Sequence, residues 1–578
     1  MVEFITSDGI HVDLVPDQEL SLSIENAMFS NDRIPVAWST DVELPVSPTN
    51  STLFGYIGAM LLPEQRREIN VAMYIDAIPA MTGKLKLTGV SEGKLQASFV
   101  GVSIEDSLSG NLQDASFARW EFGSAIAGQR PLFDEIMEGA AQNTRDDFAL
   151  PLMVRESEKD TADNYVANSL IGSIEYEDFG IKYLNSPKYN FVTPVVKLAY
   201  ILRTAFSDVR VDELYSGYFE KIGIVAPYRK NSASTLDGKY NLPTDGVDDG
   251  PLNFVLDLAD SMPDVSLEDF VKNMLAAFCA TIFIHRGVTQ MKSNRAIIQD
   301  ESFVDWSQKI SDNVEIEFED GQIYEYGFSG VSDDELSAEV KDYNTISDCF
   351  NAPDDTFVRC LDTGDIYRKI QRPYISGHGS QTFYANGLDL ARQDSMIPPT
   401  QDSQSDSSID TFSATSNWVP VKCIPYVFNY SLDMINWFDG VMLPIVNDPT
   451  VGGTRPTTVQ FGLLQDGAVG QEYVPAVQLT SNGYIGGMLG LFSPANPPLN
   501  LAGDNGLYVR FHKDFQSWLK KDKTVYKIDV NLSAADIANL QIWKKVMLFN
   551  RLFFIKTLSI TLNTTKDYIR TEADLVTA

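Results

Sequence analysis

The sequence contains few of the residues that bind metals or form disulfides. Only 4 of its 578 residues are cysteine and only 4 are histidine. No two cysteines lie close enough for a CxxC pair, so we predict neither a disulfide framework nor a zinc ribbon, and we expect free thiols made in a reducing cytoplasm. No histidine lies within metal-ligand spacing of another, and the HExxH pattern is missing, which disfavours a zinc hydrolase. The residues concerned are Cys279, Cys349, Cys360, Cys423, His11, His285, His378 and His512.

Basic charge is also scarce. Lysine and arginine number 45 against 79 aspartate and glutamate residues, which gives a formal net charge of −34. Binding to DNA regardless of sequence, or to an anionic membrane surface, requires clustered lysine and arginine. The charge therefore argues against both kinds of binding, and we expect no specific nucleic-acid contact.

Long apolar runs are missing as well. No stretch of 18 apolar residues occurs, and the run around Met547–Ile560 is interrupted by Asn550, Arg551 and Lys556. The N-terminal residues show no basic segment followed by an apolar one. We therefore expect neither a membrane span nor a signal peptide.

The chain nevertheless has enough apolar material for folded cores. Hydrophobic residues make up 44% and aromatic residues 11% of the sequence, so the chain as a whole is not predicted to be disordered. At about 100–200 residues per domain, the length predicts three to five domains.

Short β-strands are predicted in the first hundred residues. Residues 4–14 predict a hairpin around a turn at Asp8-Gly9, and residues 84–99 predict a second one around residues 91–93. Between them, Leu20, Leu22 and Ile24 alternate with polar residues, as in a half-buried strand. Such short, two-sided strands favour a small barrel or sandwich.

The middle of the chain combines helices and hairpins. Thr193-Pro194 predicts a helix start, followed by apolar residues at helical spacing up to Phe206. Ser266 predicts the cap of a second helix, whose apolar stripe extends to Phe278. Hairpins are predicted over residues 281–291 and, around a turn at Asp320-Gly321, over residues 314–328.

Residues 331–500 are less regular, and the end of the chain is regular again. Residues 331–500 are predicted to be β-rich with long loops, the clearest of which is the polar stretch 401–416.

The end of the chain predicts four elements. They are an aromatic helical face over 508–519, a strand over 526–532, a helix capped by Ser533 and a hairpin over 546–562.

Together these patterns predict a β-rich, multidomain α+β chain with a mixed α/β central domain and long loops. We expect an N-terminal β domain (1–106), an insertion or connecting domain (107–190) and a mixed helix and hairpin domain (191–330). A β-rich region with long loops (331–500) follows, and a helix–strand–hairpin element (501–578) completes a β domain.

Motifs that carry chemistry are weak. His378 lies in a glycine loop without a nucleophile motif nearby. Residues 245–250 resemble a calcium loop but have Val247 at the third ligand position and Leu256 at the twelfth. The P-loop pattern is missing, and the glycines of 483–490 lack the flanking strand and helix of a dinucleotide site. We therefore assign no catalytic, cofactor-binding or metal-ligating residue, expect no cofactor, and do not expect an enzyme.

Three stretches, in this order, resemble structural tail proteins of phages and prophages of Bacteroidetes hosts. The first comprises LSLSIE (20–25), VELPVSPTN (42–50), LFG (53–55) and MTGKLKL (81–87). The second runs from MPDVSLEDFVK (262–272) through Phe278 to VDWSQKI (304–310), and is similar to a hub region in which a short helix packs beside a hairpin. The third comprises GLY (506–508), Trp518, VNLSAAD (530–536) and TEADL (571–575).

The resemblance implies a hub at the baseplate or tail tip of a virion, assembled in the host cytoplasm. In such hubs, two tube-like β-barrel domains per chain let three subunits form a pseudo-sixfold ring that adapts the hexameric tail tube to a trimeric tip. The implied partners are two further copies of the chain, the tail tube, distal tail and tape measure proteins, and the tail fibre or spike proteins.

Several alternatives stay open at this stage. The chain is also compatible with a distal tail or other baseplate protein, or with the hub of a phage-derived contractile injection system. The aromatic content keeps a glycan-binding or cell-wall-degrading tail-tip protein possible, since the two carboxylates of a glycosidase meet in space and not in sequence. The acidic charge fits the lining of a channel that passes DNA without retaining it, and equally a need for solubility.

Overall fold

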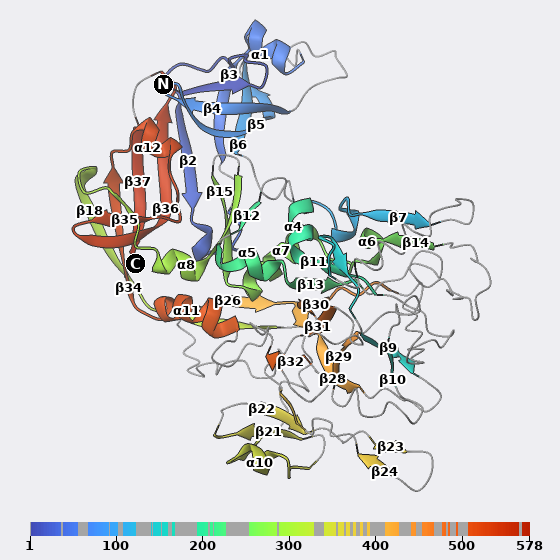
Figure 1. The fold of residues 1–578 in the computed structure, drawn as a ribbon. Helices are drawn as coiled ribbons and strands as arrows, with labels where there is room; N and C mark the ends of the chain where they lie inside the picture. Colours follow the sequence, from blue (N-terminus) through green and yellow to red (C-terminus); the bar gives the residue numbers. More distant parts are fainter. Residues whose placement is uncertain are drawn as a thin grey trace.

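A computed structural model shows a β-rich chain with few helices (Figure 1). It describes residues 2–35, 39–55, 68–91, 93–101, 108–122, 140, 143–151, 153–159, 165–167, 193–205, 209–211, 213–226, 254–285, 288–328, 340–353, 356–362, 366–369, 374–376, 382–384, 390–392, 411–426, 441–446, 454–466, 477–480, 484–485, 493–494, 507–565 and 569–578. None of the described helices is long and apolar enough to cross a membrane.

The two ends of the chain build one double-sheet body. Its first sheet has the strand order β1-β4-β5-β6-β3, with β1 (Val2–Thr6), β3 (Ser39–Pro45), β4 (Glu68–Ile75), β5 (Ile78–Ser91) and β6 (Lys94–Gly101). The second has the order β17-β35-β36-β37-β34-β18, and β2 pairs with β36. Its strands are β2 (Glu19–Glu25), β17 (Phe303–Asp305), β18 (Ile310–Glu319), β34 (Lys523–Val530), β35 (Lys545–Leu548), β36 (Arg551–Asn563) and β37 (Ile569–Thr577).

Strand β2 joins the first part of the chain to the last. It alternates exposed and buried residues along its whole length, and Leu22 lies directly across from Ile560 of β36. Figure 1 shows β2 (blue) beside β36 (red). Most of the buried side chains of both sheets form one core, which also takes in α12 (Ala534–Ala538). Neither end can bury its apolar face without the other.

A second core lies among the helices and strands of the middle of the chain. A six-stranded sheet has the order β27-β30-β13-β11-β8, with β31 beside β30, and a three-stranded one the order β12-β16-β15. These comprise β8 (Phe148–Ala149), β11 (Val195–Lys197), β12 (Val209–Val211), β13 (Ile222–Val225), β15 (Ala280–His285), β16 (Val288–Ser293), β27 (Trp418–Pro420), β30 (Val459–Asp466) and β31 (Val477–Thr480). Their helices are α4 (Leu198–Ala205), α5 (Glu213–Phe219), α6 (Leu258–Ser261), α7 (Leu267–Ala277), α8 (Asn294–Gln299) and α11 (Lys513–Leu519), with 3-10 turns η1 (Ala27–Phe29) and η2 (Leu112–Asp114) and a π-helical turn η4 (Tyr508–His512).

Aromatic rings fill this middle core. Phe278, fully buried at the end of α7, meets the rings of Trp418, Phe461 and Phe511 edge-on at centroid distances of 6.0–6.3 Å. Such edge-to-face contacts add to the stabilisation from apolar burial. The long strands reach both cores: Phe554 of β36 packs in the middle core, while its neighbour Phe553 packs in the core of the end body.

The remaining strands form small sheets. They are β7 (Arg119–Phe122) with β14 (Phe254–Asp257), β19 (Ile323–Phe328) with β26 (Thr411–Ser416), and β9 (Val154–Lys159), β10 (Tyr165–Ala167), β28 (Lys422–Tyr426) and β29 (Val441–Val446) in one sheet. A further sheet contains β20 (Val340–Tyr343), β21 (Phe357–Cys360), β22 (Ile366–Lys369) and β25 (Leu390–Arg392), beside α10 (Ile346–Cys349). Two short pairs are β23 (Tyr374–Ser376) with β24 (Thr382–Tyr384), and β32 (Tyr484–Ile485) with β33 (Ser493–Pro494).

Many local predictions are confirmed. The Ser266 side chain caps α7 by accepting the backbone N–H of Asp269, and the predicted apolar stripe of that helix is buried. The 84–99 and 281–291 hairpins appear as β5–β6 and β15–β16. The 546–562 hairpin appears as β35–β36, but turns at Phe549-Asn550, one residue earlier than predicted, with both residues at positive φ.

The predicted helix after Thr193-Pro194 begins later than expected. Val195 and Val196 form strand β11 between β8 and β13, and α4 starts only at Leu198. Two adjacent β-branched residues favour an extended backbone. Buried partner strands on both sides complete the ladder, so tertiary pairing overrides the capping signal.

The predicted 314–328 hairpin is wrong. Strand β18 pairs antiparallel with β34, whereas β19 pairs parallel with β26. The Asp320-Gly321 turn leads from one sheet to another, because Gly321 and Gln322 donate their backbone N–H groups to the Asp522 side chain and the Leu519 carbonyl. Residues 411–416 of the polar stretch predicted as a loop form β26; residues 401–410 lie outside the described part.

Candidate functional site

The structure keeps the described histidines apart. His11 is exposed, with its Nδ1 3.1 Å from the carboxylate of Glu3. The Nδ1 of His285 lies 3.1 Å from the carbonyl oxygen of Leu540, and His512 is buried in the middle core. His378 and the 245–250 segment lie outside the described residues. Within the described part, no three His, Cys, Asp or Glu residues come together as a metal site.

Three of the four cysteines are confirmed as free thiols. Cys279, Cys349 and Cys360 are buried and unpaired with one another as disulfides. Cys349, the last residue of α10, and Cys360 nevertheless lie in one small apolar cluster, which their sequence separation did not predict. Burial and the neighbouring Cys360 raise the pKa of Cys349 to about 11, so its thiol stays protonated and unreactive at neutral pH. Cys423 belongs to β28, where only the backbone is described.

A groove of about 360 Å³ opens at the N-terminal end of α7. It lies between this helix end and the first residues of β27 and β30, and Trp418 contributes to its lining. This volume is in the range of small-molecule sites. The lining residues are Asp264, Val265, Ser266, Asp269, Asn273, Asn417, Trp418, Thr457, Thr458 and Val459.

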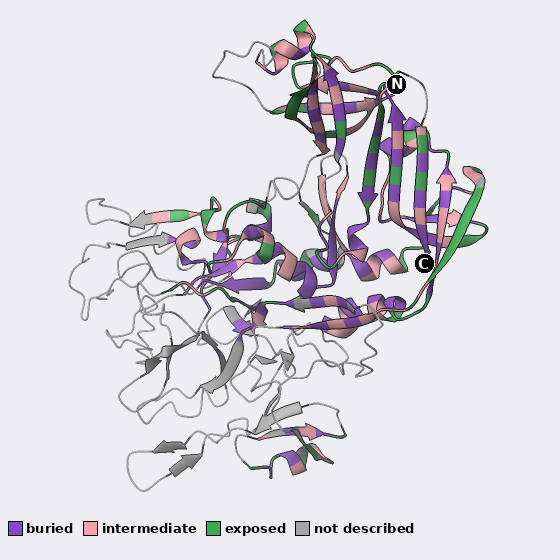
Figure 2. Cartoon of the chain, turned by 180° about the vertical axis from the view of Figure 1, so that it is seen from behind, coloured by how far each residue is buried: buried purple, intermediate pink, exposed green. Residues whose placement is uncertain are grey.

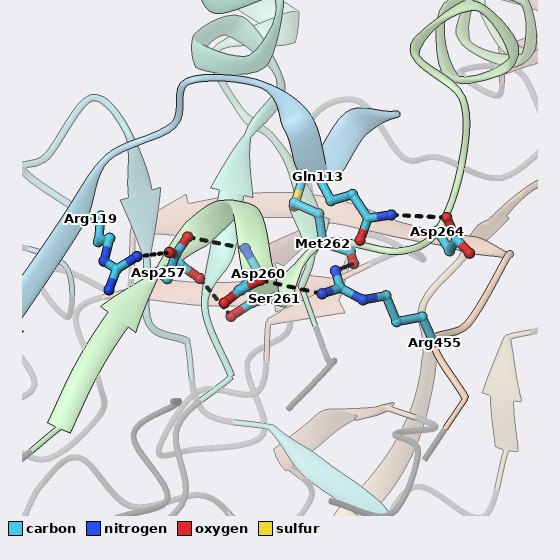
Figure 3. A network of polar contacts seen from close by, with 8 residues as sticks. All are labelled: Gln113, Arg119, Asp257, Asp260, Ser261, Met262, Asp264 and Arg455. Carbon is cyan, nitrogen blue, oxygen red and sulfur yellow. Dashed lines mark hydrogen bonds and ion pairs between the residues drawn. The ribbon is translucent and has the colours of Figure 1, made fainter. Parts of the chain in front are cut away.

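A network of polar contacts lies beside this groove and includes one of its lining residues, Asp264 (Figure 3). Arg455 reaches across to the Asp260 carboxylate at 3.3 Å and to the Met262 carbonyl at 3.5 Å. Arg119 lies 3.4 Å from the carboxylate of Asp257, which also accepts the backbone N–H of Asp260 at 3.0 Å and so caps α6. Three segments distant in sequence, around residues 119, 257–262 and 455, are thereby held together.

The polar groups inside the groove are largely engaged by the fold itself. Asp264 accepts side-chain amide hydrogens from Gln113 at 3.1 Å and from Asn111 at 3.3 Å. Asp269 accepts the Ser266 hydroxyl at 2.7 Å, and the side-chain oxygen of Asn273 accepts the backbone N–H of Asn417 at 2.6 Å. The described lining has carboxylates, amides and hydroxyls but no histidine, cysteine, lysine or arginine. This lining supplies no activated nucleophile.

A second polar cluster lies inside the middle core, around His512. The hydroxyl of Tyr324 lies 2.6 Å from Nδ1 of His512 and 3.6 Å from Sγ of Cys279, and Nε2 of His512 lies 3.0 Å from the carbonyl of Ala277. A neutral ring that donates from Nε2 and accepts at Nδ1 satisfies both of its contacts. Tyr326 stacks on the other side of the ring at 5.0 Å.

Burial sets the protonation of this cluster. It lowers the pKa of His512 to about 3, with a further lowering by the positive charge of Arg33 and an opposing effect of the Ala277 carbonyl. It also raises the pKa of Cys279 and of Tyr324 above their ordinary values. All three groups are neutral at physiological pH. Sequence reasoning did not single out His512, although helical spacing from Tyr508 (i+4) and to Phe515 (i+3) puts it on the predicted aromatic face.

The chain was compared with known proteins. No family model matches it, and no curated protein does. Among solved structures, it aligns over its full length with a tail protein from Neisseria meningitidis MC58 (95% of that chain, 8% identity, TM-score 0.30). It also aligns with the 43 kDa tail protein of prophage MuSo2 from Shewanella oneidensis (98%, 6%, 0.31) and prophage tail protein gp18 from Listeria monocytogenes EGD-e (94%, 8%, 0.29), again over its full length.

Proposed function

We propose that this chain is a structural, non-enzymatic protein of a phage tail, and that it forms the hub at the baseplate or tail tip. The supporting observation is the way the chain ends assemble. The first and third stretches that resemble tail proteins are far apart in sequence. Strand β2 of the first nevertheless pairs with β36, which also pairs with β37, and β37 contains part of the third. Stretches that lie at opposite ends of the sequence thus belong to one double-sheet body.

In this role the chain closes and adapts the end of the tail tube. Three copies form the ring, and the tail tube, distal tail and tape measure proteins, with fibre or spike proteins, are its neighbours during genome delivery. The net charge of −34 supports this role, since a tube end with few basic side chains does not retain passing DNA.

The mass of the purified protein in solution tests the proposal. Light scattering with and without the tail tube protein of the same phage should give a trimer, near three times 64.2 kDa, or a monomer that assembles as three copies per tube end. A stable monomer that ignores tubes and binds or degrades host glycans would instead favour a glycan-binding or cell-wall-degrading tail-tip protein. A protein that binds tubes as a hexamer would favour a distal tail protein.

A further inference from the structure

Strand β18 is an unusual edge of the C-terminal sheet. It is ten residues long, it is the last strand in the sheet order, and its one strand partner among the described residues is β34. The residues from Asn313 to Phe318 are exposed on both faces of the strand. In Figure 2 this edge is the long green strand at the side of the C-terminal sheet. Edge strands offer unpaired backbone N–H and C=O groups, and most proteins blunt or cover them.

One face of this edge is apolar. Val314, Ile316 and Phe318 are 41%, 49% and 83% exposed, and they point to the same side of the strand. Val314 lies directly across from Ile528, which is buried in the core of the end body. The apolar face of the sheet therefore continues from β34, where it is buried in the core, onto β18, where it is exposed. Removing these side chains from water is favourable whenever a partner covers them.

The other face is acidic. Glu315, Glu317 and Glu319 alternate with the apolar residues, and each lies opposite a residue of β34. Lys527 pairs with Glu317 at 2.6 Å, and Lys556 of β36 pairs with Glu319 at 2.5 Å. With Asp320, which follows the strand, these glutamates make four carboxylates near three lysines, Lys523, Lys527 and Lys556, so the edge keeps a small excess of negative charge.

From these two faces we infer that β18 is a docking edge for an extended segment of another protein, one whose residues alternate between basic and apolar side chains. A strand added at this edge places one set of side chains opposite the glutamates and the other opposite the apolar row. Lysine or arginine complements the first row and a β-branched or aromatic residue the second. Strand β34, on the other side of β18, already pairs basic residues with the glutamate row, because Lys523 lies opposite Glu319 and Lys527 opposite Glu315.

The inference goes beyond the proposed tail role and does not depend on it. A hub, a distal tail protein or a glycan-binding protein with this edge would accept the same kind of strand. If no peptide binds at this edge, the proposed function is unaffected, because that function is tested by the mass of the assembly.

Binding of short fluorescent peptides to the full chain tests the inference. The probe is a peptide that alternates lysine with valine and isoleucine. Its matched controls are a peptide of the same composition with the lysines in one block, and an alternating peptide with glutamate in place of lysine. We expect saturable binding of the probe alone in fluorescence anisotropy, with slower amide hydrogen exchange over residues 310–319, since a new strand protects the edge backbone.

Variants of the edge separate this site from others. The double variant Ile316→Thr with Phe318→Ser keeps β propensity at position 316 and should weaken binding by roughly tenfold or more. Its control is Phe549→Ser, which removes a side chain that is 59% exposed away from β18 and should leave binding unchanged. Glu315→Lys alters one exposed side chain and should also weaken binding, so the test stays decisive if the double variant misfolds.

Three outcomes would overturn the inference. Equal binding of the block and alternating peptides would mean attraction by net charge alone. Protection outside residues 310–319 would place the site elsewhere. Association of the free chain with itself that the double variant abolishes would show that a second copy occupies the edge.

Discussion

The side-chain amide of Asn26 donates hydrogen bonds to the carbonyl oxygen of Ile555, 529 residues further along the chain, at 2.8 Å, and to that of Ile542 at 3.1 Å. Its side-chain oxygen accepts the backbone N–H of Met28 at 3.1 Å. Asn26 is buried, so the end of β2 is fastened to the C-terminal sheet by a fully used amide.

Replacing Asn26 with alanine should therefore weaken the attachment of β2 to the C-terminal sheet and lower the stability of the chain. One buried and one partly buried carbonyl and one backbone N–H lose this hydrogen-bond partner, and we expect a loss of about 2–4 kcal/mol in the free energy of unfolding. Chemical denaturation followed by circular dichroism measures it. Asn351→Ala, which removes an exposed amide that donates to the carbonyl of Ser347, four residues earlier, is the control and should change little. A loss as small as that of the control would contradict the fastening role.

Phe270 should be a core residue whose truncation is costly. Its side chain is fully buried, and its ring centroid lies 4.8 Å from that of Trp418. Phe270→Ala should destabilise the chain by about 2–5 kcal/mol, because it leaves a cavity in a packed aromatic cluster. Leu361→Ala, at a position that is about half exposed, should cost far less. Unchanged thermal stability of the Phe270 variant would show that α7 does not pack as described.

The turn that replaces the expected hairpin predicts a glycine requirement. A Cβ atom at Gly321 would lie 2.1 Å from the carbonyl oxygen of Lys520, a contact that backbone atoms cannot relieve without moving. Gly321→Ala should lower the free energy of unfolding by roughly 1–3 kcal/mol, as measured by chemical denaturation. Gly327→Ala is the matched control, since a Cβ there meets nothing within 4 Å. Equal effects at the two positions would refute the close approach.

His512 predicts a pH dependence with a definite sign. Its folded-state pKa of about 3 lies below the ordinary value of 6.5, so the unfolded chain takes up a proton that the folded chain refuses. Its contribution to stability is complete above about pH 6.5 and falls by about 1.4 kcal/mol per pH unit as the pH drops toward 3.

A variant isolates this effect from the many carboxylates that titrate in the same range. Gln at position 512 supplies one donor for Ala277 and one acceptor for Tyr324 but does not titrate. Between about pH 6 and pH 4, His512→Gln should lose less stability than the natural chain in denaturant titrations. Parallel curves for the two proteins would mean that His512 is protonated or exposed in the folded state.

Local structure followed from short-range patterns in the sequence. Alternating polarity predicted β2, Ser266 predicted the start of α7, and the aromatic spacing of residues 508–519 predicted a buried helical face, of which Phe511, Phe515, Trp518 and Leu519 are buried. Each depends on side-chain periodicity or on a capping hydrogen bond a few residues away, and both are properties of the local chain.

Partner choice was decided only by the tertiary structure. Nothing near β2 indicates that its neighbour is β36, and nothing near Asp320-Gly321 indicates that β18 and β19 enter different sheets. An apolar row can be covered by any complementary strand, and which one does so depends on the free energy of the whole core. The same reason explains the exposed edge. The sequence by itself determined that β18 alternates apolar and acidic residues. Only the fold determined that its apolar side chains stay exposed to solvent and are not buried in the core.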